Sequence, residues 1–268
     1  MRPDIRAVLT GSSLIVLFLF LYRGVTFIKQ EKSMSIVDQN EAVEELSLDE
    51  NQPDKVVVMA KTKSEDTDWV GIHLPDWQHA IYHMDEPKAK LHVPKNKGRE
   101  AMAYLTYLID HYNNLPSTIA FIHSHEKGFP AAWHTDAYGY DNVRSLNMLK
   151  IDHVQQTGYT SLRCIEEPGC PNEIQPFRAG KDEGLRHSET TMIDAWTQMF
   201  GKHSQIPDVI AATCCSQFAV SKAQVLQRPR DDYIRFRKWL LDTKVDDATS
   251  GRVMEYLWHI FFGKEPVQ

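Results

Sequence analysis

Two short apolar runs, separated by an amphipathic helical pattern, constrain the fold of this chain more than any other feature. The runs Lys55–Ala60 and Ser117–Ile122 have the length and the apolar content of buried strands. Between them, positions 102, 105, 108, 109 and 112 are apolar at helical spacing. A strand, a helix and a second strand in this order make a crossover connection, which predicts parallel strands and an α/β sheet.

The remaining segments predict more strands and helices. The expected strands are His79–Tyr82, Asp208–Ala212 and Gln217–Val220, and the expected helices are Thr191–Phe200, Asp231–Leu241 and Gly251–Phe262. Together these elements predict a mostly parallel sheet flanked by helices, in a single globular domain over residues 55–268. With 268 residues, of which 42% are hydrophobic, the chain is long enough to bury one sizeable core.

An uncharged apolar segment precedes this domain. Residues 7–22 carry no charge, and arginines at positions 2, 6 and 23 flank them. A spanning helix needs about 17–25 residues, so the segment is long enough only if the side chain at position 23 extends to the interface. The alternative is a cleaved signal peptide, but no small-x-small cleavage motif follows the apolar run. We therefore predict an N-terminal signal anchor, or transmembrane helix, within residues 1–30.

The segment after the anchor predicts where the domain is placed. Residues 31–54 are polar and acidic, which is typical of a flexible stem, and nearly all of the folded mass follows them. Basic residues lie on both sides of the apolar run, so the charges do not fix the orientation. We expect a single-pass membrane protein of the secretory pathway (Golgi or endoplasmic reticulum) with a lumenal C-terminal domain.

Charge and the absence of familiar motifs narrow the classes of function. The net charge of −6 argues against non-specific nucleic-acid binding, which requires a basic surface, so no nucleic-acid partner is expected. The sequence contains no P-loop, no G-x-G-x-x-G fingerprint and no Ser-His-Asp elbow. These absences argue against nucleotide triphosphatases, dehydrogenases and serine hydrolases. The expected partners are the membrane and a small-molecule substrate.

Four cysteines allow two different interpretations of each pair. Cys164 and Cys170 flank a Pro-Gly turn, so they either form a disulfide in an oxidising lumen or remain two free thiols. Cys214 and Cys215 are adjacent, and we interpret them as small buried residues on a strand rather than as a redox pair.

A polar helix start offers a phosphate site. Asn96, Lys97, Gly98 and Arg99 precede the first predicted helix, where free backbone amides and the helix dipole favour an anion. Arginine binds phosphate in a bidentate manner, although a solvated Lys-Arg pair is the alternative. Asp66 belongs to an Asp-x-Asp pattern after the first strand, which is typical of metal-phosphate binding and equally of a solvated turn.

Two further groups carry catalytic potential. His123, His125 and His134 follow a predicted strand, and alternate residues on an extended strand share a side, so these histidines are candidate ligands for a divalent metal ion. Arg252, Glu255 and His259 are spaced i, i+3, i+7 on one predicted helix face. Glu255 and His259 are candidate catalytic residues, with Glu255 as general base, and Arg252 is a candidate ligand for a diphosphate. The alternative for this face is a solvated set of ion pairs.

A series of motifs in chain order resembles an uncharacterised fungal family of unknown function whose members often carry a membrane anchor. The motifs are Val57–Lys61, Glu65–Trp69, Asn96–Glu100, Leu115–Pro116, Phe121–His123, Trp133–His134, Cys214–Ser221, Arg228–Pro229 and Gly251–His259. The resemblance covers about residues 55 to 264, which is nearly the whole domain.

That family is in turn distantly similar to sugar-nucleotide glycosyltransferases of the GT-A type. The similarity implies a GT-A-like α/β fold and a membrane-anchored transferase of a fungal biosynthetic pathway, using a nucleotide-activated donor such as a sugar nucleotide. Where GT-A enzymes carry Asp-x-Asp, this chain has His123-Ser-His125, which favours a softer ion such as zinc. Two alternatives remain open: a non-sugar transferase similar to the aminoacyl-transferring cyclodipeptide synthases, and a catalytically degenerate binding domain.

Overall fold

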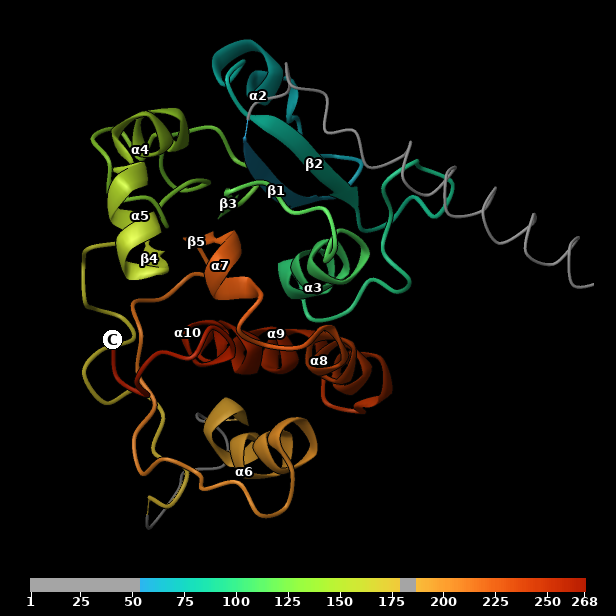
Figure 1. Cartoon of the computed structure of the whole chain (residues 1–268), viewed down its shortest axis with the longest axis vertical. Helices are drawn as coiled ribbons and strands as arrows, with labels where there is room; N and C mark the ends of the chain where they lie inside the picture. The colour runs from blue at the N-terminus through green and yellow to red at the C-terminus, as the bar shows by residue number, and fades with distance from the viewer. Residues whose placement is uncertain (1–53, 179–186) are drawn as a thin grey trace, which may run out of the picture. The chain divides into compact units, whose positions relative to one another are not determined.

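The computed structural model describes residues 54–178 and 187–268 (Figure 1). The predicted anchor within residues 1–30 lies outside these ranges, as does the predicted stem apart from Asp54. No helix within the described ranges is long and apolar enough to cross a membrane.

A mixed sheet forms the centre of the domain, with its strands in the order β2-β1-β3-β5-β4. The strands are β1 (Lys55–Lys61), β2 (Gln78–His83), β3 (Thr118–Phe121), β4 (Tyr159–Ser161) and β5 (Phe218–Ser221). β1 pairs in parallel with both β2 and β3, which confirms the predicted crossover topology. β5 is antiparallel to β3 and to β4, so the other four strands share one direction and the sheet is mostly parallel.

Both faces of the sheet are covered because its central strands are apolar on both sides. Val56 and Val58 of β1 pack into the larger core cluster, together with the helix that crosses from β2 to β3. Val57 and Met59 point to the opposite face and join a smaller cluster with Trp69 and neighbouring residues. A strand buried on both faces shows a continuous apolar run, as Val56–Met59 does, rather than alternation.

Helices surround this sheet. Their bounds are α2 (Asp68–His73), α3 (Glu100–Asp110), α4 (Asn142–Met148), α5 (Ile151–Thr157), α6 (His187–Phe200), α7 (Lys222–Val225), α8 (Arg230–Asp242), α9 (Asp247–Glu255) and α10 (Trp258–Phe261). α3 packs against β1, α8 and α9, and α6 packs against α8 and α9. Figure 1 shows α8, α9 and α10 as a layer between the sheet with α3 and the outer helix α6.

Two sequence predictions for the C-terminal half are wrong. The helix expected over Gly251–Phe262 is broken into α9 and α10, and Tyr256 and Leu257, which lie between them, are fully buried. The strand expected over Asp208–Ala212 is absent, because this segment makes only isolated bridges, to Ile174 and Val267. The helices expected over residues 191–200 and 231–241 are confirmed, with small extensions.

The strand order determines where a ligand is expected. β2 and β3 follow β1 in the sequence and pair with opposite edges of β1. The connections therefore run in opposite directions from β1, which makes β1/β3 a topological switch point. Ligands of such sheets bind beyond the carboxyl ends of the strands at this point. Because β5 is antiparallel and Phe218 pairs with Phe121, the residues that precede β5 lie at this same edge.

Candidate functional site

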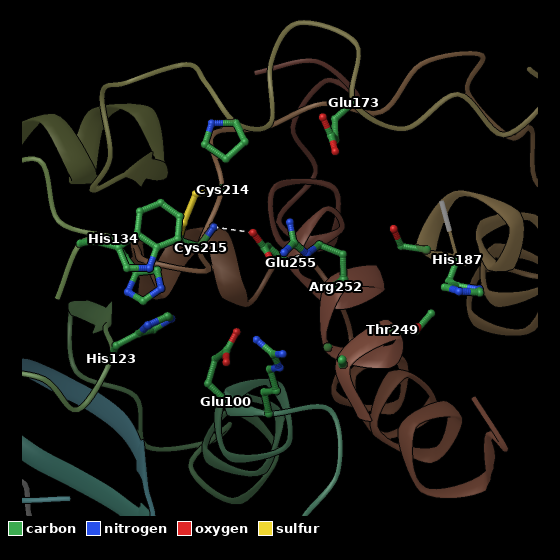
Figure 2. A pocket seen from close by; sticks show the side chains of 16 residues that line it. Glu100, His123, His134, Glu173, His187, Cys214, Cys215, Thr249, Arg252 and Glu255 are labelled. Atoms are coloured by element: carbon green, nitrogen blue, oxygen red, sulfur yellow. Dashed lines mark hydrogen bonds and ion pairs between the residues drawn. A yellow bond between two sulfur atoms is a disulfide. The ribbon is translucent and has the colours of Figure 1, made fainter. Parts of the chain in front are cut away.

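Two adjoining cavities lie at this edge of the sheet. The larger has a volume of about 550 Å³ and is lined by residues from α3, α9 and the loops after β3 and before β5. The smaller has a volume of about 260 Å³ and is lined by the residues that end β1 and β3. Arg99, Glu100 and His123 line both cavities, so the two cavities adjoin each other. Figure 2 shows that Glu100, His123, His134 and Glu255 face the larger cavity.

Glu255 is held in the wall of the larger cavity by two contacts. Its Oε1 accepts a hydrogen bond of 2.7 Å from the backbone amide of Cys215, and its Oε2 lies 3.3 Å from Nε of Arg252. Burial raises the pKa of Glu255 above its ordinary value; Arg252 and the Cys215 amide oppose this effect, and the charge of Glu100 adds to it. Arg252 and Glu255 lie on one face of α9, as their spacing predicts, and they form an ion pair. A carboxyl group in this setting is suited to proton transfer.

Glu100 is a second carboxyl group of the site that sequence reasoning missed. It is the first residue of α3 and lines both cavities. Burial is the main cause that raises its pKa above the ordinary value. Arg99 precedes it with φ of 52° and also lines both cavities. Three carboxyl groups, those of Glu100, Glu173 and Glu255, and two guanidinium groups, those of Arg99 and Arg252, therefore line the larger cavity (Figure 2).

The predicted anion site at the start of α3 is occupied by the chain itself. Oδ1 of Asp247 accepts hydrogen bonds from the amides of Gly98, at 2.7 Å, and Arg99, at 3.4 Å. The Lys97 ammonium donates to the carbonyl of Val245. A helix start attracts negative charge, and here the carboxylate of Asp247 supplies it. The backbone amides of Gly98 and Arg99 and the Lys97 side chain are therefore engaged within the domain, which corrects this part of the prediction.

Both backbone conformation and packing require glycine at position 98. Its φ of 71° lies in the left-handed region, and a Cβ atom at this position would lie 2.5 Å from Cδ2 of Leu240. The glycine thus allows α8 to pack closely against the segment before α3. Asn96, the remaining member of the predicted phosphate group, lines the smaller cavity.

Asp247→Ala is expected to lower the free energy of unfolding by about 1–2 kcal/mol, because two amides at the start of α3 lose their acceptor. Urea denaturation of the full chain measures this change. Sulfate should restore more stability to the variant than to the wild type, since the vacated amides then bind an external anion. Asp242→Ala, at the exposed end of α8, is the control and should change stability by less than about 0.5 kcal/mol. An unchanged midpoint for Asp247→Ala would contradict the capping role.

The three histidines do not form one group. The rings of His123 and His134 are in contact, with centroids 4.5 Å apart, whereas Nε2 of His125 lies 3.7 Å from Oε1 of Glu65. Burial lowers the pKa of His123 to about 4 and that of His134 to about 3, so both are neutral at neutral pH. Nε2 of His123 and Nδ1 of His134 are buried and find no hydrogen-bond partner within the described ranges.

This arrangement fits a metal ion only in part. Neutral imidazoles with free nitrogens are suitable ligands, but zinc sites use three or four protein ligands, and this pair supplies two. Among the described residues, three donor groups come close enough to share an ion at Cys214, Cys215 and Glu255. The two sulfurs of that group are joined to each other, so they are not free to bind an ion.

Glu65 is the acidic residue that the structure directs into the site, in place of Asp66. Its carboxylate accepts hydrogen bonds from the Thr62 amide at 2.6 Å, from the Thr62 hydroxyl at 2.8 Å and from the Ser124 hydroxyl. Burial raises the pKa of Glu65, but these hydrogen bonds outweigh it and the pKa is lowered. Asp66 is exposed and accepts from the Asp68 amide at 2.9 Å, so the solvated turn describes it correctly.

His259 is placed away from the cavities. It is fully buried, and its Nε2 lies 3.0 Å from the carbonyl oxygen of Pro266. The break between α9 and α10 removes it from the face that carries Arg252 and Glu255. The spacing i, i+7 places residues on one face only in an uninterrupted helix, which is why the sequence pattern misled.

The cysteines also differ from the prediction. Cys214 and Cys215 are buried as expected, but they lie before β5 rather than on a strand, and a disulfide joins them. Both line the larger cavity. Cys164 and Cys170 are free thiols, in agreement with the second of their two interpretations.

Comparison with protein families adds one result. Residues 57–268 match the family described as "Protein of unknown function (DUF3431)". A search of curated proteins finds no match to the chain.

Proposed function

The chain belongs to the DUF3431 family, and we propose that it is a transferase that acts on a nucleotide-activated donor bound in the two adjoining cavities. In the finer form of this proposal the donor is a sugar nucleotide, the fold is GT-A-like and an N-terminal anchor holds the enzyme at a membrane. The observation that carries the proposal is Glu255, a carboxyl group that is 13% exposed, has a raised pKa and faces a cavity lined by two arginines.

The two arginines provide the binding of the donor phosphates. Arg99, immediately before α3, and Arg252 of α9 line the larger cavity, so two guanidinium groups border the same cavity. Guanidinium groups bind phosphate oxygens by charge-assisted, bidentate hydrogen bonds. The position at the β1/β3 switch point supports a nucleotide ligand, since ligands of open α/β sheets bind at such points.

Glu255 acts as the general base in this proposal. In its ionised form it accepts the proton of the acceptor nucleophile, and a raised pKa brings a carboxylate closer to the pKa that favours proton transfer at neutral pH. The Cys215 amide fixes Oε1, and Arg252 lies against Oε2, so the carboxylate is oriented before the substrate arrives. Trp133 and His134 line the same cavity and supply a wall for the acceptor.

Binding of UDP and GDP to the purified full chain, measured by calorimetry, tests the donor. Arg252→Met is expected to weaken the binding by about 10- to 100-fold, since hydrogen bonds to charged groups contribute about 1.5–3 kcal/mol each. Arg144→Met, which removes an exposed arginine of α4 outside the cavities, should leave the affinity unchanged.

The outcomes separate the classes of function. Hydrolysis or transfer from one sugar nucleotide in a panel would support the sugar donor. Transfer from an aminoacyl donor, with no affinity for nucleoside diphosphates, would favour the aminoacyl-transferring alternative. Binding of a diphosphate without turnover of any donor would indicate a degenerate binding domain. Absence of diphosphate binding, or binding that Arg252→Met does not affect, would overturn the donor site.

A further inference from the structure

The disulfide between Cys214 and Cys215 lies in the wall of the larger cavity. The two residues are only 2% and 6% exposed, and both line this cavity, which gives a small reagent a route to their sulfurs. Disulfides between neighbours in the sequence close no long loop, so the entropic stabilisation that cross-links give to distant segments does not explain this one. Its position beside the candidate base suggests a different role.

We propose that Cys214 and Cys215 form a redox-active pair that exchanges with a small thiol or dithiol entering the cavity, and that the state of this pair controls the backbone amide that holds Glu255. The pair then adds a thiol–disulfide reaction to the site, and its substrate class is a low-molecular-weight thiol.

Arg163 is the first observation that supports this reaction. Its Nη1 lies 3.0 Å from Sγ of Cys214 and 3.3 Å from Sγ of Cys215, and the side chain is buried. A guanidinium group next to sulfur stabilises the thiolate, which is both the nucleophile and the leaving group of thiol–disulfide exchange. Because it contacts both sulfurs, it stabilises whichever of them leaves.

The same contact argues against a metal site at the reduced pair. Cys214, Cys215 and Glu255 could offer three ligands after reduction. The positive charge of Arg163, however, lies in contact with both sulfurs and would repel a cation there. The environment therefore favours redox chemistry of the thiolates over metal binding.

The backbone supplies the second observation. Closing a disulfide between adjacent residues makes an eight-membered ring, and the amide nitrogen of Cys215 is a member of that ring. This amide donates to Oε1 of Glu255 at 2.7 Å. Cys215 and Ser216 have φ of 92° and 53°, which are left-handed values unusual for side-chain-bearing residues. Opening the ring therefore releases a strained turn and frees the peptide plane that points at Glu255.

The reaction balances as an ordinary dithiol–disulfide exchange. A thiolate of the reductant attacks one sulfur of the pair, the bond between the two cysteine sulfurs breaks, and the other sulfur leaves as a thiolate beside Arg163. The second thiolate, from the same dithiol or from a second molecule of a monothiol, then attacks the reductant's sulfur in the mixed disulfide. The bond between that sulfur and the protein breaks, and the cysteine leaves as a thiolate. Two electrons pass to the protein, the reductant becomes a disulfide, and the protons of its two thiols protonate the cysteines or pass to the buffer.

The first experiment uses the full chain carrying Cys164→Ser and Cys170→Ser, so that the pair provides the only thiols. The folded chain is equilibrated with glutathione buffers, quenched with acid, unfolded and labelled with a maleimide for mass spectrometry. No label without reductant, and two labels after incubation of the folded chain with reductant, are expected. Two labels without reductant would overturn the disulfide. Labels that appear only when reductant is present during unfolding would show an inert disulfide and overturn the redox role.

Arg163 and the ring are tested separately. Arg163→Met is expected to shift the equilibrium constant about tenfold toward the disulfide, or ~30 mV for two electrons, and Arg163→Lys should shift it less. An unchanged constant in Arg163→Met would overturn the role of Arg163. Far-ultraviolet circular dichroism checks that each variant is folded.

Amide hydrogen exchange in the same background reports on the ring. Labelling with ¹⁵N-cysteine then shows only the amides of Cys214 and Cys215. The Cys215 amide should exchange at least about tenfold faster after reduction, while the Cys214 amide, which is outside the ring and donates to the Pro168 carbonyl at 3.2 Å, changes less. Equal changes, or none, would overturn the link to Glu255. None of these measurements requires turnover of a donor, so they test the redox pair independently of the proposed transferase activity.

Discussion

Glu255→Gln is expected to lower turnover of the donor by about 10²- to 10⁴-fold, the range that a positioned general base contributes. Glutamine has the same shape and can still accept the hydrogen bond from the Cys215 amide, but it cannot accept a proton. Binding of UDP or GDP should change by no more than a few fold, since in the proposed mechanism the phosphates contact the arginines. Steady-state kinetics together with calorimetry separate the two effects.

The pH dependence gives an independent check on the same residue. A general base works only when it is ionised, so activity should fall as the pH falls through the pKa of Glu255. Burial raises that pKa, and the loss should therefore begin at a higher pH than for an exposed glutamate. Glu265→Gln, at an exposed position, should leave both the rate and the pH profile unchanged. Wild-type activity in Glu255→Gln would rule out this residue as the base.

Phe218→Ala is expected to lower the free energy of unfolding by about 3–5 kcal/mol. Phe218 is 1% exposed, and its ring lies 4.9 Å from that of Phe121, 5.3 Å from that of Trp258 and 5.3 Å from that of Tyr159. Removing the ring leaves a cavity at the junction of β3, β4, β5 and α10. We expect the cavity to remain, because pairing and packing hold these elements in place.

Denaturant unfolding of the full chain, followed by tryptophan fluorescence, measures this loss. Phe177→Ala is the matched control, because Phe177 is 57% exposed and should change stability by less than about 0.5 kcal/mol. Phe218→Tyr tests shape and polarity together and should lie between the two. A loss below about 1 kcal/mol for Phe218→Ala would show that the aromatic junction relaxes, contrary to the packing described.

Sequence reasoning predicts the parallel part of the fold because that part is governed by local patterns. β1 and β3 each show a short continuous apolar run, α3 shows an apolar helical period, and the order of the three elements requires a crossover. Short elements escape detection: α2 has only six residues and β4 only three, which is too few for a period to emerge. The break before α10 is set by tertiary burial of Tyr256 and Leu257, which no helical pattern encodes.

In the candidate site, too, the features that local patterns encode are predictable and those that depend on tertiary contacts are not. The spacing of Arg252 and Glu255 predicts one shared helix face because one turn of helix separates them, and in the structure the two side chains are in contact. Glu100 was missed because its carboxyl group becomes unusual only when other segments cover it. The role of Asp247 depends on the approach of α9 to the start of α3, a contact between residues 149 positions apart.

The disulfide between Cys214 and Cys215 could not be predicted from sequence patterns, for a different reason. Adjacent cysteines occur in buried segments without being bonded, and whether they join depends on the backbone turn that presents their sulfurs to each other. The left-handed values at Cys215 and Ser216 define that turn, and neither residue type predicts them.

The antiparallel strand β5, which lies between β3 and β4, affects how the sheet can form while the chain is being synthesised on the ribosome. β1, β2 and β3 can pair as soon as residue 121 has emerged, but the strand that covers the free edge of β3 begins only at residue 218. At a synthesis rate of about 5–20 residues per second, the apolar edge Thr118–Phe121 waits roughly 5–20 s for its partner. A nascent chain with an open apolar edge is prone to pair with other chains, so we expect this protein to depend on chaperones during synthesis more than a purely sequential sheet would.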